Sequence, residues 1–175
     1  NYTTMEHHFD EAFGYYAAPV DFKSGYTGSE SLRYWASYSE ELDATFPFID
    51  RIMNSYKKGR AAIVAKNYTV KDAEVTKIHE SLEILIAASA IHYINAANAE
   101  SNTANRLHLL SEGYFFLKSL RYANTSHRKI TQAELDTMLN TDFGNNFWNI
   151  SSTGLNSIKT KLSSTYGLDA VKDQL

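Results

Sequence analysis

Two His/carboxylate pairs are the residues of this sequence whose types and spacing could do chemistry. His8 and Glu11 are three positions apart, and His108 and Glu112 are four positions apart. On an α-helix either spacing places both side chains on one face, where they can reach one point. A neutral imidazole beside a carboxylate is half of a site for a transition metal such as iron or zinc. The same pair also commonly satisfies a partly buried histidine by a hydrogen bond, and the spacing alone leaves both interpretations open.

The surroundings of the two pairs give a weak reason to connect them. Each pair is followed by small and aromatic residues, EAFGYY at 11–16 and EGYFFL at 112–117, which suggests a faint internal duplication. Two such helices facing each other across a bundle would bring two histidines and two carboxylates together. A third pair, His79 and Glu83, has helical spacing without that aromatic context and shows how often the spacing arises by chance.

Four other polar residues have a predicted role. His7 points about 100° away from His8 on a helix, so the two do not easily serve one ion. Asp10 is predicted to interact favourably with the dipole of its helix or to pair with a basic neighbour. His92 lies in an apolar stretch and is predicted to be buried, neutral and bonded to one partner. Arg60 ends a basic patch that begins at Lys57 and Lys58, and it lies beside the apolar run AAIVA. The patch is either a solvated helix face or a cationic group aimed at an acidic partner or a buried carboxylate.

The hydrophobic periodicity predicts the helices that must position these residues. The expected helices cover residues 3–17, 30–42, 46 or 47 to 66, 69 or 72 to 99, 104–122 and 132–139. A last helix is expected to follow a cap at Ser152 or Thr153 and to run to about residue 166, with Gly167 as its C-cap. The stretch from Leu82 to Ile94 is apolar on most sides, which predicts a central helix buried on most sides. With no Pro- or Ser-rich linker, the expected organisation is a single all-α domain over residues 1–175.

Composition excludes several classes of function. The chain has 175 residues, 2 Pro, 8 Gly, no Cys and a net charge of −3. Without cysteine there is no disulfide, thiolate zinc site or cysteine nucleophile. The charge gives no general attraction to nucleic acid, and no apolar run approaches the roughly 20 residues of a membrane span. The H-E-x-x-H, G-x-S-x-G and glycine-rich phosphate motifs do not occur. The 12 Tyr leave room for a sugar- or peptide-binding surface that the sequence does not localise.

Four motifs in a fixed order resemble an uncharacterised family of exported bacterial lipoproteins related to the imelysin-like proteins. The motifs are HHFDEAFGYY at 7–16, KKGRAAI at 57–63, AIHYI at 90–94 and HLLSEGYFFLKSLRY at 108–122. The resemblance covers roughly residues 2–125. The ordered set is specific for the family but not for an activity, because the function of the family is not established.

The resemblance implies an up-and-down bundle of about six to eight helices. It also implies a location at the envelope of a Gram-negative bacterium, as a periplasmic protein or an outer-membrane lipoprotein. Imelysin-like proteins carry a G-x-H-x-x-E motif associated with metal binding, and several are tied to iron acquisition. His8 and Glu11 match its His and Glu, whereas Glu6 stands where the motif has Gly. Family members are typically longer, so the chain is compatible with the C-terminal portion of a longer protein.

Three hypotheses of function follow. The first is a non-catalytic cell-envelope protein linked to iron acquisition, with a divalent metal ion, iron or zinc, on His8 and Glu11. His108 and Glu112 are then further candidate ligands. The second is a structural or partner-binding helical domain without metal, for example one that binds another envelope protein, in which the pairs are buried polar networks. The third is a peptide or glycan hydrolase, for which no catalytic residue can be named.

Overall fold

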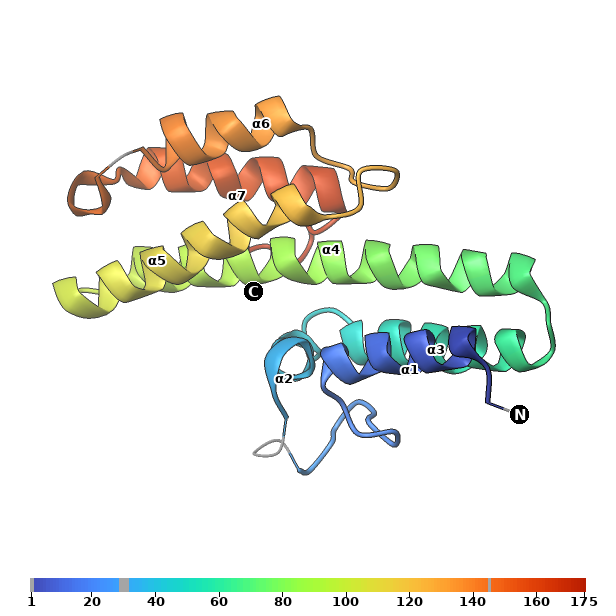
Figure 1. Ribbon diagram of the computed structural model, residues 1–175. Helices are drawn as coiled ribbons and strands as arrows, with labels where there is room; N and C mark the ends of the chain where they lie inside the picture. Colours follow the sequence, from blue (N-terminus) through green and yellow to red (C-terminus); the bar gives the residue numbers. More distant parts are fainter. Residues whose placement is uncertain (1, 29–31, 145) are drawn as a thin grey trace. The chain divides into compact units, whose positions relative to one another are not determined.

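The structure of the chain is a computed structural model that describes residues 2–28, 32–144 and 146–175. All regular secondary structure in these ranges is helical, which confirms the predicted all-α fold class. The chain divides into two compact units, residues 1–82 and 83–175. Figure 1 shows the helices of both units along the chain.

The first unit contains α1 (Thr4–Tyr16), α2 (Tyr34–Leu42), α3 (Phe48–Val64) and the first half of α4 (Tyr68–Ala99). Each of α1, α2 and α3 contacts the other two. Their shared core is fully buried and contains mainly aromatic and branched aliphatic side chains: Tyr16, Phe22, Phe48, Ile49 and Ile52. The predicted start of the second helix, at residue 30, lies outside the described residues.

The second unit contains residues 83–99 of α4, then α5 (Thr103–Ser119), α6 (Gln132–Thr137) and α7 (Ser152–Tyr166). A short 3₁₀ turn (Leu120–Tyr122) extends α5, and a π-helical turn (Met138–Asp142) extends α6 and contacts both α5 and α7. A second 3₁₀ turn (Phe147–Asn149) precedes α7. In this unit α5 and α7 lie nearest to the second half of α4, and α6 lies farther from it (Figure 1).

The second half of α4 is the central helix of its unit, as its apolar pattern predicted. Residues 83–85, 87–91 and 94 are all buried, so its side chains are covered on most sides. Small residues allow neighbouring backbones to come close. A Cβ added to Gly113 of α5 would lie 3.4 Å from Cβ of Tyr93 and 3.7 Å from the carbonyl oxygen of Ala90.

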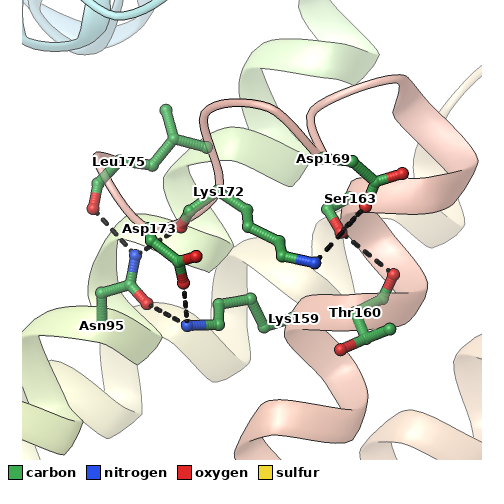
Figure 2. Close-up of polar contacts among 8 residues, drawn as sticks. All are labelled: Asn95, Lys159, Thr160, Ser163, Asp169, Lys172, Asp173 and Leu175. Carbon is green, nitrogen blue, oxygen red and sulfur yellow. Dashed lines mark hydrogen bonds and ion pairs between the residues drawn. The ribbon is translucent and has the colours of Figure 1, made fainter.

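The segment after α7 folds back and is anchored on α4. Gly167 ends α7 in the left-handed region at φ 72°, as predicted for its C-cap. Asn95 Nδ2 then donates to the carbonyl oxygens of Lys172, at 2.7 Å, and Leu175, at 3.0 Å (Figure 2). Lys159 Nζ donates to Asn95 Oδ1 at 3.0 Å and to Asp173 at 2.8 Å. The hydrogen bond and charge of Lys159 hold the pKa of Asp173 below its ordinary value.

Candidate functional site

The N-terminus of α1 is closed by a reciprocal pair of bonds between Thr3 and Glu6. The Glu6 backbone N–H donates to Thr3 Oγ1 at 3.3 Å, and the Thr3 backbone N–H donates to Glu6 Oε2 at 2.7 Å. This capping box satisfies two of the amide donors that a helix start leaves without partners. It also fixes the Glu6 carboxylate in a buried position beside α3.

Arg60 of α3 joins this carboxylate to a second one. Its Nη1 donates to Glu6 Oε1 at 2.8 Å, and its Nε donates to Asp10 Oδ1 at 2.8 Å. The Tyr2 hydroxyl donates to the other oxygen of Asp10 at 2.9 Å, and the Arg60 guanidinium lies 5.8 Å from the centre of the Tyr2 ring. Of the two sequence interpretations, Arg60 therefore follows the one in which a cation is aimed at a buried carboxylate. Lys57 and Lys58 are exposed, as a solvated face requires.

The network shifts the pKa values of Glu6 and Arg60 toward their charged forms. The backbone N–H and hydroxyl of Thr3, and then Arg60, hold the pKa of Glu6 below its ordinary value. Partial burial opposes the charge of Arg60, but the hydrogen bonds that it donates to Asp10 and Glu6 outweigh this effect and raise the Arg60 pKa. Glu6 and Arg60 are therefore charged at neutral pH.

An aromatic cluster and one glycine bring α1 and α3 together below this network. Tyr56 of α3 lies 5.8 Å from Phe9, 5.2 Å from Phe13 and 5.9 Å from Tyr16, measured between ring centres. A Cβ on Gly59 would lie 2.5 Å from Cζ of Phe9, so only glycine leaves room for that ring. Burial raises the pKa of Tyr56 to about 12, and its hydroxyl donates to the carbonyl oxygen of Ala12.

A groove of about 420 Å³ lies between α1, α3 and the segment that follows α1. Its lining is mostly apolar, with three charged residues: Phe9, Asp10, Phe13, Val20, Met53, Tyr56, Lys57, Arg60, Ala61 and Val64. Val20 and Val64 are 78% and 63% exposed. Exposed aliphatic side chains around a concave surface are typical of binding sites for small molecules.

A second hollow, of about 380 Å³, has an aromatic lining. Tyr15 of α1 and Tyr34, Trp35 and Tyr38 of α2 form it. Tyr15 and Tyr34 are 81% and 75% exposed. The sugar- or peptide-binding surface for which the 12 Tyr leave room stays a prediction.

The predicted metal ligands of the first pair lie on the exposed face of α1. His8 and Glu11 are both exposed. The structure pairs Glu11 with His7, whose Nε2 lies 3.5 Å from Glu11 Oε1. The His7 and His8 ring centres are 5.8 Å apart. The assignment of His8 and Glu11 as ligands stays a prediction.

The second pair and His92 belong to the second unit. His108 is exposed and Glu112 is half-buried on α5. His92 on α4 is half-buried and not buried as predicted, and its ring meets that of Tyr93 edge to face at 5.3 Å. Across the described residues no group of three or more His, Cys, Asp or Glu side chains gathers in a way that could hold a metal ion.

Two carboxylates have structural roles that the sequence did not predict. Glu6 departs from the G-x-H-x-x-E motif, and the spacing of Thr3 and Glu6 is that of a capping box. Glu83 is buried and accepts hydrogen bonds from the Tyr166 hydroxyl at 2.7 Å and the Lys129 backbone N–H at 2.9 Å. No local pattern predicts Glu83, because its partners are 46 and 83 residues away in the sequence. Burial and this bond raise the pKa of Tyr166.

The comparison with protein families matches residues 1–169 to a family described as "Domain of unknown function (DUF4856)". The chain belongs to this family. No curated protein and no solved structure matches the chain. Kinship of the DUF4856 chain with imelysin-like proteins stays a prediction. None of its helices, in the part of the chain that the structure describes, combines the length and apolarity needed to cross a membrane.

Within the DUF4856 chain the four sequence motifs meet in two pairs. In the first unit, HHFDEAFGYY meets KKGRAAI through Phe9 against Gly59 and Asp10 against Arg60. In the second unit, AIHYI meets HLLSEGYFFLKSLRY through Gly113 against Tyr93 and a stack of Tyr93 on Phe116, with ring centres 5.6 Å apart. Much of what makes these motifs recognisable is therefore the packing of helix pairs.

Proposed function

We propose that this chain is a non-catalytic binding protein and that the groove between α1 and α3 is its binding site. The observation that carries the proposal is the groove itself, which has an apolar wall, exposed valines and a volume typical of small-molecule sites. Its polar groups suit binding better than proton transfer. Asp10 and Arg60 are bonded to each other, and the pKa of Arg60 lies above its ordinary value, so the guanidinium does not release a proton.

A neutral apolar dye, N-phenylnaphthylamine, tests the groove directly. Its fluorescence should rise when it binds the folded protein. Ala61 lines the groove and its side chain is exposed, so Ala61→Trp should fill the groove without disturbing the core and should abolish the rise. Tyr38→Ser, which opens the aromatic hollow instead, is the matched control and should leave dye binding in place. If Ala61→Trp binds the dye like the wild type, the groove is not the binding site.

A metal-linked form of this function is the second candidate. The observation that favours it is the presence of two imidazoles and a carboxylate, His7, His8 and Glu11, on one exposed part of α1. These donors suit iron or zinc. The described residues supply fewer than three convergent donors, so the affinity expected of these residues is low. The link to iron acquisition and the envelope location rest on the resemblance to imelysin-like proteins.

Thermal unfolding with added Zn²⁺ or Fe²⁺ tests the metal candidate, because a ligand that binds only the folded state raises Tm. His8→Ala combined with Glu11→Ala should abolish that rise. His108→Ala with Glu112→Ala tests separately whether the second predicted pair, on α5, contributes to the rise. A double variant of His8 and Glu11 that keeps the full rise would show that the ions bind elsewhere. Fractionation of cells that make the full-length protein tests the envelope location.

A further inference from the structure

The apolar wall of the groove extends along much of α3. The residues that α3 contributes to it include Met53 near one end and Val64 at the other. At a rise of 1.5 Å per residue these two positions are about 16 Å apart along the helix axis. Phe9 and Phe13 of α1 line the groove beside them. A wall of this length, with aliphatic and aromatic side chains along it, suits an extended alkyl chain.

The charges at the groove are not equivalent. Arg60 is held by Asp10 and Glu6, so its charge is already balanced by carboxylates. Lys57, one turn earlier on α3, also lines the groove and is exposed. Within the described part of the chain, no carboxylate lies within ion-pair distance of Lys57. The groove therefore combines an apolar wall with one ammonium group that is available to a ligand.

We infer that the natural ligand is a free single-chain amphiphile with an anionic head group, such as a medium-chain fatty acid. Its head group lies beside Lys57, and its alkyl chain extends from there along the apolar wall toward Val64, about 10 Å along the helix axis. Burial of the alkyl chain supplies most of the affinity, and the ion pair at the solvent-exposed rim supplies the preference for a negative head. This inference rests on the proposed function, because it names the ligand class of the same groove.

Three probes with the same alkyl chain and different head groups test the inference. They are dodecanoate, dodecanol and dodecyltrimethylammonium, titrated calorimetrically below the concentration at which each forms micelles. Dodecanoate should bind most tightly. Lys57→Met should weaken dodecanoate about fivefold and leave dodecanol unchanged, which is the size expected of an exposed ion pair. Lys58→Met is the matched control, because Lys58 is the neighbouring exposed lysine and does not line this groove.

The outcomes separate this inference from the proposed function. If dodecanol binds and Ala61→Trp blocks its binding, but dodecanoate binds no more tightly than dodecanol, the groove is a binding site and the assignment of an anionic head group is wrong. Tightest binding of dodecyltrimethylammonium overturns the inference in the same way. If Lys57→Met and Lys58→Met weaken dodecanoate equally, the preference reflects general charge and the placement at Lys57 is wrong. If no probe binds and the apolar dye also fails, both the inference and the proposed function fall.

Discussion

At two helical glycines, Gly59 and Gly113, adding a Cβ methyl group is expected to change the stability in opposite directions. A methyl group on Gly59 would overlap Phe9 at 2.5 Å, whereas on Gly113 the nearest atom is at 3.4 Å, an ordinary contact. Alanine favours a helix over glycine by about 1 kcal/mol at either position. The space around the added methyl group therefore decides the sign of the change in stability.

We expect Gly59→Ala to lower the free energy of unfolding by about 1 kcal/mol, because the cost of overpacking exceeds the gain in helix propensity. Gly113→Ala should be neutral or stabilising by up to about 1 kcal/mol. Urea unfolding measures both. Combining Gly59→Ala with Phe9→Leu should recover part of the loss. Equal effects of the two single substitutions would contradict the packing argument.

The buried carboxylate of Glu6 gives a second prediction. Arg60→Met keeps the length of the side chain but leaves Glu6 and Asp10 without their cation. The urea midpoint of unfolding should fall, because a buried carboxylate without a partner is strongly disfavoured. Arg60→Lys should recover only part of the loss, since an ammonium cannot reproduce the two directed bonds of the guanidinium.

Lys58→Met removes an exposed charge two residues earlier on α3 and serves as the control for Arg60→Met. It should have little effect on the midpoint. The low pKa of Glu6 means that the contribution of the network is present above the ordinary pKa of a glutamate and disappears as the pH falls through the folded-state value. At the acid end of that range the midpoints of the wild type and Arg60→Met should therefore converge.

The sequence predicted part of this site at the residue level. The sequence left two alternatives for each residue: a solvated face or a cation aimed at an acidic partner or buried carboxylate for Arg60, and the helix dipole or a basic neighbour for Asp10. The network of Glu6, Asp10 and Arg60 follows the second alternative for each. The pairing of Glu11 with His7 was not anticipated, because side-chain rotamers on an exposed helix face are not determined by spacing alone.

Helix bounds were the most predictable feature at the level of elements. The ends of α1, α3 and α7 lie within about two residues of their expected positions, where cap residues such as Gly167 mark the stop. The irregular stretch from Met138 to Asn149 was not predictable in detail. Its π-helical and 3₁₀ turns depend on contacts with α5 and α7 rather than on local propensity.

The contact between α6 and α7 predicts a defined acid dependence. Lys161 of α7 lies 2.5 Å from Glu134, and this ion pair, with the backbone N–H of Thr131, lowers the pKa of Glu134 from 4.5 to about 2. A carboxyl with a lowered pKa stabilises the fold above its unfolded value and loses that contribution as the pH falls. Solvent screens this partly exposed pair, so its contribution is about 1 kcal/mol or less.

Glu134→Gln should therefore be less stable than the wild type at pH 7, and the difference should shrink between pH 4.5 and about 2. Thermal unfolding followed by circular dichroism across this range measures the effect. Added salt at pH 7 should also reduce the difference. A difference that stays constant with pH would show that the substitution acts through packing or helix capping and not through charge.

The anchor of the C-terminal segment on α4 gives a prediction about local opening. Asn95→Ala removes the donor to Lys172 and Leu175 and should cost about 1 kcal/mol. Amide hydrogen exchange should speed up at Val171, Gln174 and Leu175, whose N–H groups form turn hydrogen bonds in this segment. Asn98→Ala, at an exposed position of the same helix, is the control and should leave these rates unchanged.

At the scale of the whole molecule, the division into two compact units lies inside a helix. The boundary falls between Leu82 and Glu83, in the middle of α4. A sequence reveals a domain boundary by a shift to loop-forming residues, and a continuous helix contains no such shift. The sequence therefore predicted a single domain, and this prediction is open to a direct measurement.

Each unit has a fully buried core of its own, so we expect core substitutions to act within one unit. Ile52→Ala should lower amide protection in α1, α2 and α3, and Leu117→Ala should lower it in α5 and α7. Each should cost about 2–5 kcal/mol in its own unit. If either substitution lowers protection equally throughout residues 2–175, the chain unfolds as the single cooperative domain that the sequence predicted.

The intrinsic tryptophan fluorescence of the chain can report on each of the two units separately. It has 2 Trp, and one falls in each unit: half-buried Trp35 in α2 and Trp148, which is 70% exposed, before α7. Trp148→Phe would leave the indole emission to the first unit alone, and Trp35→Phe would leave it to the second. Unfolding and ligand titrations could then be followed in each unit by the wavelength and intensity of tryptophan emission, without attaching a label.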